Sequence, residues 1–272
     1  MDPFSLNYHS FRLIEVIGYP HAGNDIFHVR GIFNHKEVTA YIKTTRQPGA
    51  AIENEAAIMR QLNSPVIPKI LDADFGVHPF SVTEAMPGLR LSVIVGSNSD
   101  MRSLEYMEEY GEALALIHSM PITANPVADR RFFHPPSDEM VERLDLSSLK
   151  DYFKNIPLDT VTVFCHGDFH YGNLLWKDHH ISAILDFELA GYGNRDFDIA
   201  WSLILRPGQQ FLKTSEEQRR FLRGYAKHGQ YSEKNILYYM AQIYVYFLSF
   251  SEDDAPYCEY VRSWLKDNCE PQ

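Results

Sequence analysis

The chain has 272 residues, 45% hydrophobic and 22% charged, with a net charge of −11. This composition is typical of an ordinary globular protein and excludes disordered, fibrous and low-complexity classes. A chain of this length forms one large domain or two modest lobes and buries roughly three quarters of its unfolded surface, so it needs no disulfides. The negative charge disfavours a nucleic-acid partner, which needs a broad basic surface, and serves either solubility or the attraction of a cationic small molecule.

The N-terminal part is predicted to be a sheet with one helix. β-Branched and aromatic residues between turn signals predict strands at 11–18, 25–33, 37–44, 69–75 and 80–86. A helix is predicted over 50–63, where apolar residues recur at helical spacing and two prolines follow. The first 86 residues are therefore expected to form a five-stranded antiparallel sheet, whose first three strands make a meander.

Beyond Pro87 and Gly88 the pattern becomes mostly helical. Helices are predicted at 103–120, 137–153, 197–205, 215–229 and 233–250, with a last one that ends near residue 267, and short strands at 160–164, 173–176 and 181–187. His179 and His180 are predicted to form a hairpin turn. The sequence thus predicts an α+β fold with a small domain, residues 1–86, and a larger, mainly helical domain, residues 87–272.

Cysteine usage and the absence of long apolar runs bear on the compartment. Three cysteines, Cys165, Cys258 and Cys269, are a sparse and odd number, which is typical of a reducing environment. Residues 1–15 lack the basic and apolar regions of a signal peptide. The most apolar late stretch, 236–250, is shorter than the ~20 residues of a membrane span. We therefore expect a cytoplasmic protein without a membrane partner.

A set of charged and polar residues in the middle of the chain indicates chemistry. Asp168 and Asn173 have the spacing D-x-x-x-x-N, and Asp186 follows on a predicted strand. Upstream, Lys43 lies near the end of the third strand and Glu55 on the next helix. Phosphoryl transfer from ATP needs such a set, because an aspartate orients the attacking hydroxyl, oxygen ligands hold Mg²⁺, and a lysine fixed by a glutamate neutralises the phosphates.

The stretches "HGDFHYGNLLW" and "ILDFELAGYGNRDFDIAW", in this order and at this distance, resemble the signature of the aminoglycoside phosphotransferase and choline kinase superfamily. The resemblance spans most of the chain, since "AYIK", "NEAAIMRQL", "VTEAMPG" and "EALALIH" also match. It implies a protein-kinase-like fold, with an N-lobe at 1–86 that binds nucleotide and a C-lobe at 87–272 that holds the catalytic loop, the metal site and the substrate-binding helices.

The resemblance also implies roles for the matching residues. Asp168 would be the catalytic base, and Asn173 and Asp186 would bind Mg²⁺. Lys43 would contact the α- and β-phosphates of ATP and pair with Glu55.

Further nucleotide contacts are implied at the two ends of the N-lobe site. The backbone of Glu84 and Met86 would hydrogen-bond adenine. Gly23 and Asn24 would lie over the phosphates, in the turn 18–27, which has fewer glycines than is usual in the superfamily.

In the C-lobe, the resemblance implies that His166 and Asp198 support the catalytic loop, Asp198 through backbone amides. Glu252, Asp253 and Asp254 are candidates for receiving a cationic substrate, and a solvated loop between the last two helices is the alternative interpretation.

The predicted function is an ATP- and Mg²⁺-dependent kinase that phosphorylates a hydroxyl of an aminoglycoside-like antibiotic or of a small metabolite such as choline or homoserine. Two other classes stay open. A nucleotide-binding pseudokinase would fit the irregular phosphate turn, although all five central residues are intact. A metallophosphoesterase would use histidines such as His166 and His170, but the other motifs of that class are missing from the sequence.

Overall fold

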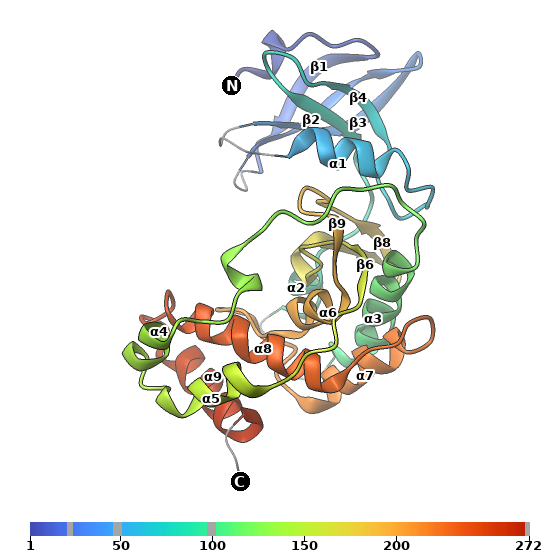
Figure 1. Ribbon diagram of the computed structural model, residues 1–272. Helices are drawn as coiled ribbons and strands as arrows, with labels where there is room; N and C mark the ends of the chain where they lie inside the picture. The colour runs from blue at the N-terminus through green and yellow to red at the C-terminus, as the bar shows by residue number, and fades with distance from the viewer. Residues whose placement is uncertain (21–23, 46–50, 97–101, 270–272) are drawn as a thin grey trace. The chain divides into compact units, whose positions relative to one another are not determined.

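The computed structural model describes residues 1–20, 24–45, 51–96 and 102–269 (Figure 1). These residues form two compact units, which are described separately. Unit 1 is Met1–Arg90, Pro121–Ala124 and Asn173–Ala190, and unit 2 is Leu91–Met120, Asn125–Gly172 and Gly191–Gln272. The segment Asn173–Ala190 thus belongs to the unit that contains the N-terminal sheet. The predicted division between residues 86 and 87 stays a prediction.

Unit 1 is built on a five-stranded sheet of order β1-β2-β3-β5-β4, in which neighbouring strands are antiparallel. The strands are β1 (Phe11–Gly18), β2 (Asp25–Phe33), β3 (Lys36–Thr44), β4 (Ile70–Asp74) and β5 (Phe80–Glu84). One face carries fully buried side chains such as Val29, Ile42 and Val82, because residues of period two share a face. The predicted α+β fold, with an antiparallel sheet near the N-terminus, is confirmed.

A helix, a 3₁₀ turn and a β-hairpin also belong to unit 1. Helix α1 (Ile52–Met59) is shorter than predicted, and a 3₁₀ turn, η1 (Pro3–Ser5), precedes the sheet. Strands β7 (Leu174–Lys177) and β8 (His180–Ile184) form a hairpin. Asp178 and His179 form its two-residue turn, and both have positive φ angles, 52° and 66°, as a tight hairpin of this length requires. The turn therefore begins one residue earlier than expected, and His180 is already in β8.

Unit 2 is mainly helical. Its helices are α2 (Leu91–Val95), α3 (Leu104–His118), α4 (Asp138–Arg143), α5 (Lys150–Asn155), α6 (Arg195–Leu203), α7 (Ser215–Tyr225), α8 (Glu233–Leu248) and α9 (Ala255–Cys269). Short 3₁₀ turns are η2 (Arg131–Phe133), η3 (Ser147–Leu149) and η4 (Tyr171–Asn173), the last of which ends at the first residue of unit 1's segment 173–190. Strand β6 (Thr162–Cys165) pairs with β9 (Gly191–Asn194).

Helices α3 and α7 pack against each other through two glycines. A Cβ atom on Gly224 would lie 1.8 Å from the backbone oxygen of Glu108, and one on Gly111 would lie 1.9 Å from that of Phe221. Neither distance is possible for a real side chain, so only glycine allows the two backbones to approach this closely.

A single buried carboxylate anchors the start of α7. Glu217 is 1% exposed and forms a capping box with Thr214. It also accepts hydrogen bonds from the Ser103 hydroxyl (2.6 Å) and from the backbone nitrogen of Leu212 (2.7 Å). Leu212 has a positive φ angle, 61°, which the hydrogen bond helps to hold. Glu217 therefore joins the beginning of α3, the preceding loop and α7.

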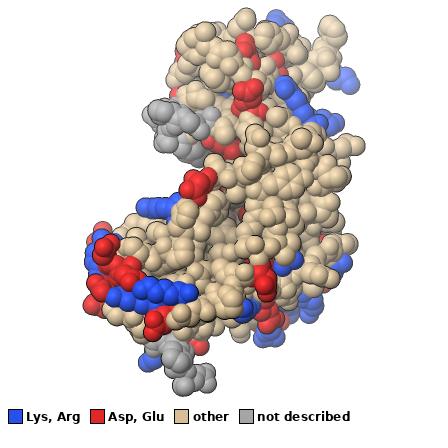
Figure 2. Space-filling model, viewed as in Figure 1, with Lys and Arg blue, Asp and Glu red and all other residues tan. Residues whose placement is uncertain are grey.

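The hydropathy of the helices, the surface charge and the state of the cysteines bear on the class of protein. None of the helices in the described ranges is long and apolar enough to cross a membrane. Charged side chains on the face drawn in Figure 2 lie in small groups of both signs. Cys165, Cys258 and Cys269 form no disulfide within the described part of the chain, and the first and last of them are buried.

Candidate active site

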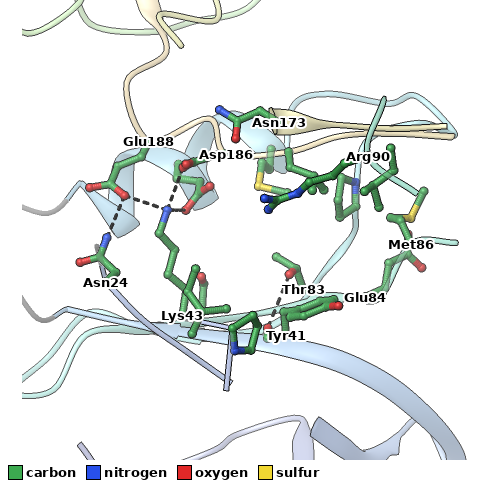
Figure 3. Close-up of a pocket in the computed structure, with 18 residues that line it drawn as sticks. Asn24, Tyr41, Lys43, Thr83, Glu84, Met86, Arg90, Asn173, Asp186 and Glu188 are labelled. Carbon is green, nitrogen blue, oxygen red and sulfur yellow. Dashed lines mark hydrogen bonds and ion pairs between the residues drawn. The ribbon is translucent and has the colours of Figure 1, made fainter. Parts of the chain in front are cut away.

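A cavity of about 290 Å³ lies within unit 1 (Figure 3). Lys43 and Glu188 lie at its polar end, and Glu84 and Met86 lie at the other end. Strand β3 supplies Lys43, and the short segment after β5 supplies Met86. The cavity thus has a cluster of charged groups around Lys43 at one end, which suits a ligand that carries a charged group at that end.

Lys43 is the centre of the polar end. Its Nζ lies 2.9 Å from Glu55 Oε2, 3.0 Å from Asp186 Oδ1 and 2.7 Å from Glu188 Oε2. Burial of the ammonium lowers the pKa of Lys43, but the charges of the three carboxylates outweigh burial, so the pKa lies above its ordinary value. Lys43 is therefore a fixed positive charge, and the strand lysine and helix glutamate expected to pair are in contact.

The carboxylates outnumber the cation that they surround. One ligand oxygen from each of Glu55, Asp186 and Glu188 lies within 4.8 Å of the other two. Asp186 has a positive φ angle, 66°, and its side chain is 44% exposed, so an oxygen faces outward. Excess carboxylate oxygens of this kind suit a hard divalent cation, because Mg²⁺ and Ca²⁺ prefer oxygen ligands. The donor set therefore fits a metal ion bound with an anionic ligand.

Other predicted residues lie around the same cavity. Asn173, Glu84 and Met86 line it, and Asn24 lies at its polar end, where Nδ2 donates to Glu188 Oε2 at 3.0 Å. Gly23 lies outside the described residues.

Sequence reasoning missed two charged residues of this cavity. Glu188 contacts Lys43, and its Oε1 accepts a hydrogen bond from the backbone nitrogen of Ala51 beside α1 (3.2 Å). Its signal in the sequence was its position, two residues after Asp186. Arg90 also lines the cavity and points into it (Figure 3). No local pattern predicts this, because the backbone pairing of Leu89 with Trp176, which are far apart in sequence, brings Arg90 to the cavity.

The second predicted group lies in unit 2, in the loop after β6. Asp168 Oδ1 accepts a hydrogen bond from the indole nitrogen of Trp201 (2.7 Å), and Oδ2 lies 3.6 Å from His170 Nε2. Burial alone would raise the pKa of Asp168, but His170, Arg206 and Trp201 lower it to about 2. Asp168 is therefore an ionised carboxylate, and its side chain keeps 24% exposure.

The buried side chains of Asp198 and His166 accept hydrogen bonds from the backbone of this loop. Asp198 accepts hydrogen bonds from the backbone nitrogens of His166 (2.9 Å) and Gly167 (3.1 Å), and its Oδ2 also lies 3.2 Å from His118 Nε2. His166 is fully buried, and its Nδ1 accepts from the backbone nitrogen of Asp168 (3.3 Å). The two residues thus fix the backbone on which Asp168 is carried. Their effect on catalysis stays a prediction.

Three residues near Asp168 escaped sequence reasoning. Trp201 lies on α6, three residues after Asp198, so it shares that helix face, and this spacing was the available signal. Arg130 donates to the backbone oxygen of Gly167 (2.7 Å). Arg130 and Arg206 both lie over the Trp201 ring, at 5.3 and 5.2 Å from its centroid. Arg130 lies in a loop distant in sequence, and Arg206 follows the end of α6, where helical spacing no longer applies, so no spacing rule reveals them.

The acidic residues predicted to receive a substrate lie in the turn between α8 and α9. Asp254 Oδ1 accepts a hydrogen bond from the backbone nitrogen of Tyr257 (3.1 Å), so it acts at the start of α9. Glu252 and Asp253 are exposed. A substrate role for the three residues stays a prediction.

The sheet of unit 1, its strand lysine paired with a helix glutamate, and the helical remainder define a protein-kinase-like fold. A model described as "Phosphotransferase enzyme family" matches residues 32–234. The chain therefore belongs to this phosphotransferase family.

Solved structures of similar fold include kinases of small molecules. Amicoumacin kinase hAmiN, in complex with AMP-PNP and Ca²⁺, is 16% identical, with a TM-score of 0.59 over 96% of this chain and 90% of that chain. Aminoglycoside phosphotransferase APH(4)-Ia, with ADP and hygromycin B, is 13% identical, with a TM-score of 0.62 over 97% and 96%. Macrolide 2′-phosphotransferase MphH from Brachybacterium faecium is 18% identical, with a TM-score of 0.56 over 99% and 96%. At these identities the likeness shows the fold alone. A search of curated proteins finds no significant match.

Proposed function

We propose that the protein is a kinase that uses ATP and a divalent metal, Mg²⁺, to phosphorylate a hydroxyl of a small molecule. The observation that carries this proposal is Lys43, held by three carboxylates at one end of a cavity. A lysine so placed neutralises phosphates, and surplus carboxylate oxygens hold the accompanying metal. Family membership supports the reaction class, and similar folds carry AMP-PNP or ADP.

In this proposal the cavity of unit 1 binds the nucleotide. Lys43, oriented by Glu55, contacts the α- and β-phosphates, and Asn173 and Asp186 hold Mg²⁺, which neutralises charge on the phosphates. At the opposite end, the backbone near Glu84 and Met86 receives adenine.

Asp168 acts on the acceptor. It receives the hydrogen bond of the attacking hydroxyl, whose oxygen forms a bond to the γ-phosphorus while the bond between that phosphorus and the bridging oxygen breaks and ADP leaves with its electron pair. The hydroxyl proton passes to Asp168. With a pKa of about 2, Asp168 is a weak base, so it orients the hydroxyl first and takes the proton only as the phosphoryl group arrives.

The test is ADP release from MgATP across a panel of hydroxyl-bearing antibiotics and metabolites, with the Asp168→Asn protein beside the wild type. We expect acceptor-dependent ADP release in the wild type and a loss of roughly 10²- to 10⁴-fold in the variant, a magnitude typical of a removed catalytic group. Asparagine keeps an oxygen that can accept from Trp201, so ATP binding, measured by calorimetry, should change little.

Two outcomes would count against this assignment. Undiminished turnover in the Asp168→Asn protein would remove Asp168 from its role. ATP binding without ADP release for every acceptor would favour a nucleotide-binding regulatory module instead.

A further inference from the structure

Within unit 2, the surroundings of Asp168 are aromatic and positively charged. Trp201 donates its indole N–H to Asp168, and the guanidinium groups of Arg130 and Arg206 lie over its ring. A third guanidinium, that of Arg131, lies 4.9 Å from the ring centroid of Phe132, and Phe132 packs edge-on against Trp201 at 5.3 Å. Three arginines are thus gathered on one connected group of aromatic rings beside the proposed acceptor-orienting residue.

These arginines are not neutralised by ion pairs of their own. Across the described ranges, none of the three forms an ion pair with a carboxylate; Arg130 instead donates to the Gly167 carbonyl and Arg206 to the Trp201 carbonyl (2.8 Å). The one neighbouring acid along the chain, Asp129, is turned toward His134, at 2.8 Å. The carboxylates of Asp168 and Asp198 act on Arg130 through space, and beside these two acids the three guanidinium groups leave positive charge in excess.

Arg206 is the group best placed to bind a ligand. It is half-buried, and its charge acts on Asp168. Its two hydrogen bonds go to the carbonyl oxygens of Trp201 and Ile204 (3.5 Å), so three of its five N–H groups make no hydrogen bond to the described residues. Free N–H groups on a planar guanidinium suit a carboxylate or a phosphate, because two parallel hydrogen bonds form at once.

The same arrangement opposes a polycationic acceptor. An aromatic ring that recognises a substrate ammonium needs a face that is open to it. The Trp201 ring already carries two guanidinium groups of the protein, and a further cation beside them would be repelled. Of the acids predicted to receive a cation, Asp254 is engaged at the start of α9.

We propose that the phosphate acceptor carries an anionic group, a carboxylate or a phosphate monoester, and that Arg206 binds this group while Asp168 orients the hydroxyl. This inference rests on the proposed kinase function and replaces the cationic acceptor with an anionic one. Arg130, which donates to the loop backbone, is a positioning residue.

The first experiment compares acceptors that share one skeleton and differ in charge. Glycerate, glycerol 3-phosphate, glycerol and 3-amino-1,2-propanediol are assayed for ADP release with MgATP, beside larger hydroxy acids, sugar phosphates and aminoglycosides. We expect the highest kcat/KM among the anionic members. Whether a carboxylate or a phosphate has the higher kcat/KM then identifies the preferred anionic group. The highest kcat/KM for an aminoglycoside or another cation would overturn the inference while leaving the kinase function intact.

The second experiment uses the best anionic acceptor and its uncharged analogue. Arg206→Gln should raise KM for the anionic acceptor about tenfold or more, as the loss of a charge-assisted hydrogen bond does, while KM for ATP stays within about twofold. Arg206→Lys should restore part of the affinity. Arg219→Gln, an exposed arginine of α7 that pairs with Glu216, is the matched control and should change neither constant. An equal rise in KM for the charged and the uncharged acceptor would show a merely structural role for Arg206 and overturn the inference.

Binding separates the two proposals if no acceptor is turned over. The wild-type protein is titrated with glycerate, glycerol 3-phosphate and the larger anions, and tryptophan fluorescence is followed, since Trp201 lies beneath Arg206. Saturable binding of an anion that weakens in Arg206→Lys supports the anion site although the kinase function fails. No anion binding overturns the inference.

Discussion

Three neighbours set the charge of Asp168. Because His170, Arg206 and Trp201 lower its pKa to about 2, the carboxylate is almost fully ionised near pH 4, where an ordinary aspartate is only about half ionised. Since the folded pKa lies below the unfolded one, the ionised group stabilises the fold above the ordinary pKa, and this contribution is lost as the pH falls toward 2.

This charge state has a measurable consequence. Titration of Asp168, followed through the ¹³C shift of labelled aspartate carboxyls and assigned with Asp168→Asn, should show no change above about pH 4. In Arg206→Gln the pKa should rise toward its ordinary value, because a positive charge that favours the ionised form is gone. A wild-type pKa above the ordinary value would contradict the geometry around this residue.

At the scale of residues, the sequence predicted a contact between two residues that follow each other in a typical order of strand and helix. It did not predict contacts that arise only from tertiary packing. A strand lysine followed by a helix glutamate predicted the ion pair of Lys43 and Glu55. Arg206 gave no signal, since an arginine in a loop has the same local pattern whether or not it lies over a tryptophan. Its environment is set by tertiary packing.

At the scale of elements, the contact of α3 with α7 is a sensitive point. Gly224→Ala should destabilise the fold by roughly 1–3 kcal/mol, because the added methyl group collides with the Glu108 backbone and the helices must separate. Thermal unfolding should show a midpoint lower by a few degrees. Gly18→Ala is the control, since its Cβ would meet only the His28 side chain, at 3.5 Å, and φ there is ordinary. An unchanged midpoint for Gly224→Ala would mean that the helices are not so closely packed.

Elements with strong periodicity were predicted well, and those defined by backbone geometry were not. Strands β1 and β2 have the predicted bounds, 11–18 and 25–33. The helix expected over 137–153 is interrupted between α4 and α5, where Asp145 has a positive φ angle of 54°. Strand β9 (Gly191–Asn194) was missed because its glycines lack strand propensity, and its pairing with β6 defines it.

At the scale of the whole molecule, the proposed function requires a metal. Chelation with EDTA should abolish ADP release, and added Mg²⁺ should restore it. In Asp186→Asn the Mg²⁺ concentration for half-maximal activity should rise at least tenfold, because one anionic oxygen ligand is lost. Asp178→Asn is a matched control, since Asp178 also has a positive φ angle, which asparagine tolerates, but lies in the exposed β7–β8 turn. Activity that survives chelation would refute the metal requirement.

The fold class of the molecule followed from the sequence because two long motifs and the order of strands and helices agree with each other. The lining of the cavity did not follow, since segments far apart in sequence, such as β3 and the stretch after β8, supply it.

The buried carboxylate of Glu217 matters for how variants of this protein will be interpreted. It binds the Ser103 hydroxyl and the backbone of Leu212. Its loss would leave several buried donors without a partner at once, which is among the costlier single changes in a protein. In a library of variants selected for activity, substitutions at Glu217 would be depleted as strongly as those at a reacting group. Sorting such data by abundance of folded protein would separate this scaffold position from Asp168.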